Sequence, residues 1–371
     1  MIYFDNASST KLNNIVFEEM IIWQRDFYGN PSSNHKFARK AKVAIENSRN
    51  KVAELLSVKP SEIFFTSSAT ESNNSILQNA VKNLKIKEFI TSKLEHDSVF
   101  QTIKKISLEK DVKIFFIEND INGNLDLNSL EILLKKCEKP FVSLMHINNE
   151  ISNINDIYIL SEISKRYGAF FHTDCVQSLG KINFKIDDNF DYISASSHKF
   201  HGPKGCGIIY AKNANIESFI YGGSQERNLR AGTENVSSIV GFAKALEISI
   251  KDLDKNFLYV ENLKKIFIKK ILKQEKIKFN GNSGILEKSS PYILNVGIEN
   301  QDEENFLIYS LDSFGICCTA SSACSSGVEK KSRVIESLNK NISPIRISLS
   351  IYNNENEINF FFEKLNQILN F

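Results

Sequence analysis

Lys199 stands where a lysine amine can do chemistry, at the end of an apolar run, residues 190–195, that predicts a buried strand. The glycine-bracketed loop 202–207 follows it closely. A long amine in such a place is poorly solvated, and a covalent bond to a carbonyl compound would stabilise it. Desolvated lysines of lowered pKa form Schiff bases with carbonyl compounds, including pyridoxal phosphate. An ordinary surface lysine at a strand end is the alternative, and this segment alone leaves both open.

A pyridoxal phosphate site also needs a phosphate-binding turn. Residues 64–71 predict a strand, a hydroxyl-rich turn and the start of a helix. Free backbone N–H groups, the helix dipole and the side chains of Ser67 and Thr70 would together suit a dianion. The alternative is simple N-capping of the helix by Ser68 or Thr70.

Five further polar residues lie in or just beyond predicted strands. Asp174 would keep a pyridinium nitrogen protonated and Gln177 would donate to the phenolic oxygen, although Asp174 could equally cap a helix. His96 suits ring stacking and proton transfer, whereas a lone histidine is more often structural. Asn149 would reach the ring oxygen or the substrate, or else belong to a turn. Arg346 would bind an α-carboxylate bidentately, or else be an edge-strand surface charge.

Cys324 lies in a run of small residues, 319–327, that has no bulky side chain to bury it. We expect a mobile, exposed loop, as a thiol that must reach a substrate and then withdraw with its cargo requires. None of the six cysteines has CxxC spacing, which weakens both a zinc site and a secreted disulfide framework. The vicinal pair Cys317 and Cys318 is expected in the core, and Cys175 and Cys206 are expected as small buried hydrophobes.

Short apolar runs alternate with helical patterns between about residues 61 and 210, which predicts a mainly parallel sheet with helices on both faces. Ligands of such sheets bind at the carboxyl ends of the strands. The predicted strands are residues 62–67, 88–92, 113–118, 141–147, 169–174, 191–196 and 207–212.

The second half of the chain predicts a smaller α+β domain. Residues 234–254 form a long helical pattern, residues 263–273 form another, and strand-like runs 291–298 and 346–351 follow. We expect a large domain at 15–254 and a small one made of 1–14 and 255–371, which carries the Cys324 loop. Five lysines in this region are expected on the solvated face of an amphipathic helix, with a docking role as the alternative: Lys264, Lys265, Lys269, Lys270 and Lys273.

The composition is that of a globular protein without a polyanion partner. Lys and Arg total 46 of the 371 residues against 44 for Asp and Glu, so the net charge of +2 gives no general attraction to nucleic acid or anionic membrane. The N-terminus has no secretory signal pattern, and no apolar stretch is long enough to span a bilayer. We expect a cytoplasmic protein without a metal site.

Taken together, these segments resemble the cysteine desulfurases of the class V, fold-type I pyridoxal-phosphate enzymes, from residue 3 to residue 350. The resemblance implies an α/β fold in which a mainly parallel seven-stranded sheet forms a large domain beside a smaller α+β domain. The segments that carry it are YFDNASST, GNPSSNH, TSSATESNN, LEH, MHINNE, HTDCVQ, SSHKFHGPKG, GTEN and SSACSS, in this order.

The resemblance also implies roles. Lys199 would bind pyridoxal 5'-phosphate covalently, His96 would stack on its ring and carry protons, and Cys324 would accept sulfur. Asn149 and Arg346 would bind the substrate. Other implied cofactor contacts are Ala69, Thr70, Asn149, Asp174, Gln177, Ser196, His198 and, toward the other subunit of a homodimer, Thr233. Ser68 and Ser197 replace family glycines, and we expect the loops to adjust rather than binding to be lost.

The implied reaction converts L-cysteine to L-alanine, with the sulfur held as a persulfide on Cys324. An acceptor such as an iron–sulfur scaffold or a tRNA-thiolating enzyme would then take it. A selenocysteine lyase or another class V aminotransferase would share Lys199 and Asp174, but an aminotransferase has no need of a mobile Cys324. A catalytically silent fold serving as a partner platform is disfavoured because Lys199, His96 and Cys324 occur together.

Overall fold

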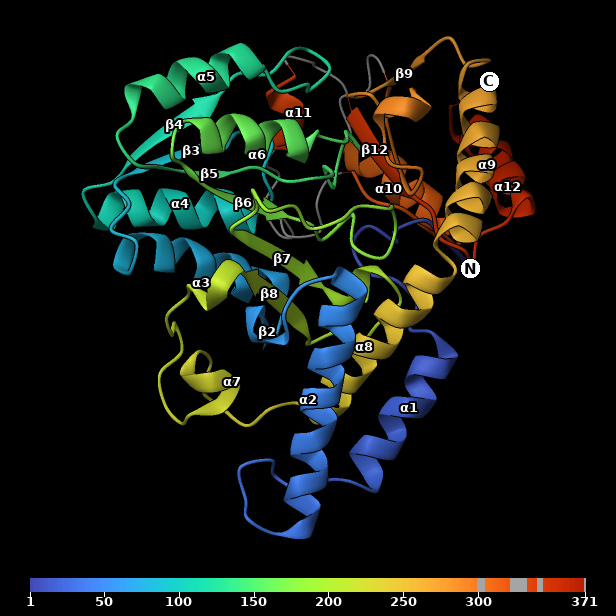
Figure 1. The fold of residues 1–371 in the computed structure, drawn as a ribbon. Helices are drawn as coiled ribbons and strands as arrows, with labels where there is room; N and C mark the ends of the chain where they lie inside the picture. Colours follow the sequence, from blue (N-terminus) through green and yellow to red (C-terminus); the bar gives the residue numbers. More distant parts are fainter. Residues whose placement is uncertain (299–303, 321–331, 339–342, 370–371) are drawn as a thin grey trace.

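A seven-stranded sheet lies at the centre of the large part of the molecule (Figure 1). The computed structural model describes residues 1–298, 304–320, 332–338 and 343–369. All seven predicted strands are confirmed, and so is the mainly parallel sheet, since only β8 runs antiparallel to its neighbours. In sheet order the strands are β2 (Ile63–Thr66), β8 (Gly207–Ala211), β7 (Tyr192–Ser196), β6 (Phe170–Asp174), β5 (Pro140–Ser143), β3 (Glu88–Ser92) and β4 (Lys113–Ile117).

Helices cover both faces of this sheet because alternate strand residues point to opposite sides. In β2, Phe64 packs into the cluster of α3 and α4, whereas Ile63 and Phe65 pack into the cluster of α2, α5, α6 and α8. Helices α1 and α2 also pack along α8 (Figure 1). The helices of this part are α1 (Asn14–Arg25), α2 (Lys36–Leu56), α3 (Ala69–Lys82), α4 (Asp97–Glu109), α5 (Leu127–Lys136), α6 (Ile157–Arg166), α7 (Gln225–Asn228) and α8 (Val236–Lys251).

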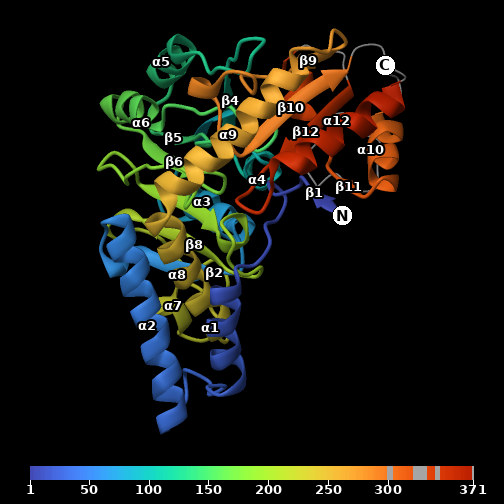
Figure 2. The ribbon, with the colours of Figure 1, turned by 90° about the vertical axis from the view of Figure 1, so that its right-hand side faces the viewer.

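A second sheet with its own apolar core forms the smaller part. Its three strands are antiparallel, in the order β12 (Ser343–Ser348), β10 (Ile293–Ile298) and β9 (Ile277–Phe279). Figure 2 shows that α8 and α9 follow one another and run from the large sheet toward the small one. The remaining elements are α9 (Leu253–Ile271), α10 (Glu304–Ser313), α11 (Arg333–Glu336), α12 (Glu355–Leu369) and the parallel pair β1 (Ile2–Tyr3) and β11 (Ile316–Cys317).

The N-terminal segment belongs to the second core, where Phe4 packs among residues of α9, α12 and β12. The predicted helices and strands of this region are confirmed, although α9 begins ten residues before the predicted 263–273 pattern. The predicted domain boundaries stay predictions. Cys175 and Cys206 are buried as expected. Cys317 and Cys318 are partly exposed rather than enclosed in the core as expected: Cys317 belongs to the two-residue strand β11, and Cys318 packs against the second core.

The expectation of a solvated lysine face is wrong for Lys264, whereas Lys265, Lys269 and Lys273 are exposed as expected. The Lys264 side chain is fully buried, since residues 260, 263, 264, 267 and 271 share the packed face of α9. Its Nζ donates to Ser289 Oγ and to Ser290 O, each at 2.7 Å, and burial lowers its pKa to about 7. By contrast, Lys265 is exposed and pairs with Glu261. Within the described ranges, no helix has the length and apolarity that crossing a membrane requires.

Candidate active site

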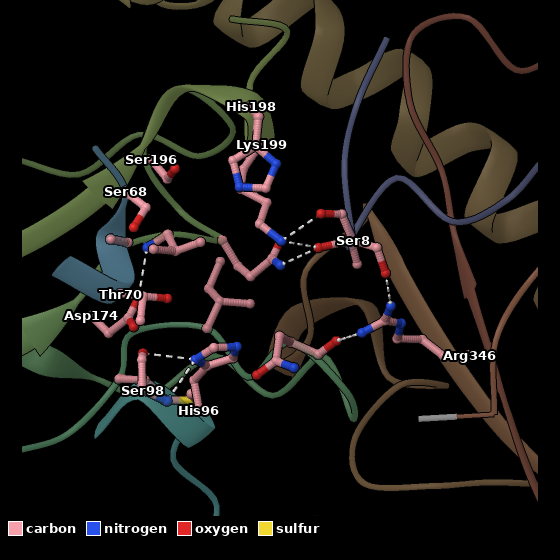
Figure 3. A pocket seen from close by; sticks show the side chains of 17 residues that line it. Ser8, Ser68, Thr70, His96, Ser98, Asp174, Ser196, His198, Lys199 and Arg346 are labelled. Atoms are coloured by element: carbon pink, nitrogen blue, oxygen red, sulfur yellow. Dashed lines mark hydrogen bonds between the residues drawn. The ribbon is translucent and has the colours of Figure 1, made fainter. Parts of the chain in front are cut away.

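A cavity of about 230 Å³ lies at the carboxyl ends of the large sheet's strands, and the N-terminal segment and Arg346 of β12 border it on one side (Figure 3). The strand topology explains it, because the segments that leave parallel strands meet at one edge. Ten of the predicted site residues line this cavity. They are Ala69, Thr70, His96, Asn149, Asp174, Gln177, Ser196, His198, Lys199 and Arg346.

The remaining two predicted site residues are Thr233 and Cys324. Thr233 is exposed and is not among the lining residues, and its predicted role toward a partner subunit stays a prediction. Cys324 lies outside the described residues.

The Lys199 amine points into the cavity rather than into solvent. The residue ends a short 3-10 turn that directly follows β7. Its Nζ donates to Ala7 O at 2.6 Å and to Ser8 O at 2.9 Å (Figure 3). Two carbonyls of the N-terminal segment therefore hold the nitrogen at the cavity wall, which does not fit an ordinary surface lysine.

The first turn of α3 borders the cavity through Ser68, Ala69 and Thr70. First-turn N–H groups have no intrahelical acceptor, and the helix N-terminus carries positive partial charge, so this turn suits an anion. Ser68 also caps the helix, since its Oγ accepts from Glu71 N at 3.2 Å. The prediction is wrong for Ser67, which does not line the cavity and whose hydroxyl donates to the Glu71 carboxylate.

Both serines that replace family glycines fit their backbone. Ser68 has a φ of −173°, an extended conformation open to any residue. Ser197 is buried, and its hydroxyl hydrogen-bonds to Pro203 O and Cys206 O in the glycine-bracketed loop. Between these turns, burial and the nearby Lys199 cation lower the pKa of His198 to about 3, so its imidazole is neutral.

Asp174 ends β6 and is held from two sides. Its Oδ1 accepts from Val176 N at 2.9 Å and its Oδ2 accepts from Asn73 Nδ2 at 2.8 Å. His96 is the N-cap of α4, and its Nδ1 lies 2.8 Å from Ser98 Oγ and accepts from Ser98 N at 3.1 Å. Sequence reasoning missed Asn73 and Ser98, although both lie within or beside segments that it singled out.

Gln177 is fixed by a lysine that the sequence did not point to. Its Nε2 donates to Ala7 O at 2.9 Å, and its Oε1 accepts from Lys181 Nζ at 2.8 Å. Burial, reinforced by Lys199 and Arg346, lowers the pKa of Lys181 to about 7. Because the Ala7 carbonyl only accepts and Lys181 donates, these two partners together determine which side of the Gln177 amide carries the oxygen.

Arg346 is a buried cation at the cavity, 1 % exposed, and not an edge-strand surface charge. Its Nη1 donates to Asn149 O at 3.0 Å, and its Nη2 donates to Asp5 Oδ1 at 2.9 Å and Ser8 Oγ at 2.6 Å. Within the described part of the chain, the buried Nε has no hydrogen-bond partner.

The chain is similar in sequence and in structure to known proteins. The family model for class V aminotransferases matches residues 2–361. A cysteine desulfurase IscS from Dictyoglomus turgidum is 37 % identical over 379 residues, covering 99 % of this chain and 94 % of that one. A solved NifS-like protein aligns with a TM-score of 0.91 at 36 % identity, over 100 % and 99 % of the two chains. SspA in complex with cysteine aligns with a TM-score of 0.80 at 28 % identity, over 95 % and 100 %.

Proposed function

Because the chain belongs to the class V aminotransferases and, within them, to the cysteine desulfurases, we propose that it removes the sulfur of L-cysteine and releases L-alanine. One observation carries this proposal. The Lys199 amine, the Asp174 carboxylate and the buried Arg346 guanidinium belong to residues that line the same cavity. An amine, an acid and a cation in one cavity suit a carbonyl cofactor and an amino acid substrate.

The residues present fit pyridoxal 5'-phosphate. Lys199 would hold it covalently, the first turn of α3 and Ser196 would hold its phosphate, and Asp174 would face its ring nitrogen. The orientation of Asp174 is fixed in advance by Asn73 and by the Val176 N–H group, so the carboxylate does not need to reorganise on binding. When bound, pyridoxal phosphate supplies an electron sink for charge that develops at the substrate.

Arg346 would bind the substrate α-carboxylate. A guanidinium that is held by Asp5 and Asn149 is already oriented for this task. Both partners fix the side chain before the ligand arrives, which lowers the entropic cost of binding. The solved complex of SspA with cysteine supports the same substrate class for this chain.

Lys199 would take up the α-proton of the substrate. Its Nζ is held in the cavity by two main-chain carbonyls, so the amine has a defined position whenever it is not bonded to the cofactor.

Cys324 would accept the substrate sulfur. Its position in a run of small residues in the sequence supports this role. The Cys324 thiolate would attack the substrate sulfur, forming an S–S bond as the substrate C–S bond breaks. The electron pair of the broken bond stays with the carbon skeleton, which takes up a proton to become L-alanine. The persulfide on Cys324 would then pass to an acceptor such as an iron–sulfur scaffold or a tRNA-thiolating enzyme. We propose a homodimer in which Thr233 completes the partner's phosphate site.

The test is to incubate purified, cofactor-loaded protein with L-cysteine and a reductant and to follow sulfide and alanine. The Cys324→Ala variant, checked for unchanged cofactor absorbance, serves as the control. Equal amounts of sulfide and alanine from wild type, and none from the variant, support the proposal. An intact cofactor spectrum with no turnover of L-cysteine contradicts it, and L-selenocysteine and amino-acceptor assays on the same sample then separate a selenocysteine lyase from an aminotransferase.

A further inference from the structure

A buried chain of hydrogen bonds links Asp174 to His96 on one side of the cavity. Asn73 Nδ2 lies 2.8 Å from Asp174 Oδ2 and 2.8 Å from Ser98 Oγ, and Ser98 Oγ lies 2.8 Å from His96 Nδ1. Asn73 is fully buried, and Asp174 and Ser98 are less than a tenth exposed. Figure 3 shows Asp174, Ser98 and His96 gathered there. The direction of each hydrogen bond in this series follows from which of its two atoms can donate a hydrogen.

The carboxylate of Asp174 accepts hydrogen bonds and donates none, so the amide nitrogen of Asn73 must face it. The opposite amide orientation would set Asn73 Oδ1 against a carboxylate oxygen. Asn73 Oδ1 instead accepts from the hydroxyl of Ser194. The two amide hydrogens of Asn73 therefore go to Asp174 and Ser98, and every donor and acceptor of this side chain is used.

Ser98 Oγ thus accepts from Asn73 and has a single hydrogen left to donate. The acceptor within reach among its hydrogen-bond partners is His96 Nδ1. The main-chain N–H of Ser98 also donates to this nitrogen, at 3.1 Å. Two donors therefore point at His96 Nδ1, which excludes a proton on that atom.

We propose that the carboxylate of Asp174, acting through Asn73 and Ser98, fixes His96 as a neutral imidazole with its proton on Nε2. Asn73 and Ser98 are then positioning residues for a group on the opposite side of the cavity from Arg346. The consequence deepens the proposed function and rests on it: His96 presents an N–H donor, not a base, to the reacting atoms. Removal of the α-proton is left to Lys199.

The charges around His96 are consistent with a neutral ring. Burial lowers the pKa of His96 below 6.5, and Lys199 and Arg333 act in the same direction. Asp174 and Asp97 oppose them. Figure 3 shows the second ring nitrogen on the far side of the ring from Ser98, so the side that carries the Nε2 proton is turned away from the two donors.

The first experiment reads the tautomer directly. Protein labelled with ¹⁵N in its histidine rings is studied by NMR without cofactor and without substrate at neutral pH, and His96→Asn assigns the signal. We expect a proton on Nε2 and a bare Nδ1. A proton on Nδ1, or a doubly protonated ring, overturns the inference. This measurement does not depend on turnover, so its failure is distinct from failure of the proposed desulfurase activity.

The second experiment tests the relay. Ser98→Ala removes one of the two hydrogen bonds to Nδ1, and we expect the pKa of His96 to rise by about half a unit to one unit, a three- to tenfold change in proton affinity. Ser98→Thr should restore it. Thr102→Val is the matched control, because this hydroxyl on the same helix donates to Ser98 O and does not contact His96. An unchanged pKa in Ser98→Ala, or an equal rise in Thr102→Val, contradicts the proposal.

Discussion

Replacing Lys264 by methionine should stabilise the protein at neutral pH, and the gain should shrink as the pH rises. The ammonium group of Lys264 is fully buried, and its described partners are neutral: the hydroxyls of Ser289 and Ser152 and the carbonyl of Ser290. A charge buried without a carboxylate is costly. Methionine fills a similar volume without that charge.

The magnitude follows from the two protonation equilibria. Burial lowers the pKa of Lys264 from 10.5 to about 7, so between these values the unfolded chain binds a proton that the folded chain does not. The free energy of unfolding of wild type should therefore rise with pH across this window, by about 1.4 kcal/mol per pH unit. Between about pH 7.5 and about pH 9.5 the advantage of Lys264→Met should fall by about 2 to 3 kcal/mol. Hydrogen bonds lost in the variant add an offset that does not depend on pH.

The assay is urea unfolding followed by circular dichroism at a series of pH values. Lys265→Met is the matched control, since Lys265 lies one residue further along α9, is exposed and pairs with Glu261 at 2.6 Å. This control should differ from wild type by less than about 0.5 to 1 kcal/mol, with no slope across the window. A wild-type-minus-variant difference for Lys264→Met that stays flat from neutral to alkaline pH would refute the reasoning.

Three further predictions concern the cavity. Arg346→Lys should raise the KM for L-cysteine about tenfold to hundredfold, by loss of a charge-assisted hydrogen bond, with a smaller effect on kcat in steady-state assays; an unchanged KM would place the carboxylate site elsewhere. Lys181→Met should leave only the Ala7 carbonyl to orient the Gln177 amide and weaken pyridoxal phosphate binding about three- to tenfold in equilibrium dialysis, and retention equal to wild type would exclude this positioning role. Because burial lowers the pKa of His96, protonation of His96 should reduce kcat/KM only below pH 6.5. In a pH profile of kcat/KM, an acid limb of the wild-type enzyme above pH 6.5 that is absent from Ser98→Ala would contradict this expectation.

The sequence predicted the parts of the fold that depend on local patterns. The strands were found because apolar runs such as residues 191–196 are bounded by turns and alternate with helices. The cavity was located because Asp174, Lys199 and His96 each follow such a strand, and parallel strands bring their carboxyl ends together. Arg346 was assigned to the site by resemblance, and the structure shows why it can reach, since β12 borders the cavity.

What the sequence missed depends on contacts between distant segments. Lys264 looks like its neighbour Lys265 in a helical pattern, and only packing of α9 against residues near 289 buries one and not the other. Asn73 reaches Asp174 across 101 residues, and Ser98 looks like an ordinary first-turn serine until both partners are in place. Ser67 turned out to bind Glu71, a choice between two neighbours that a hydroxyl-rich turn leaves open.

Mass spectrometry of the protein after brief exposure to L-cysteine tests the central claim most directly. Without reductant, and with thiols blocked afterwards, the peptide that contains Cys324 should carry one additional sulfur atom, with one alanine released for each sulfur gained. Peptides with Cys137, Cys175 and Cys206 serve as internal controls and should stay unmodified, and fragment ions distinguish Cys324 from Cys317 and Cys318 in the shared peptide. Alanine release without sulfur on Cys324, or sulfur on another cysteine, would contradict the account.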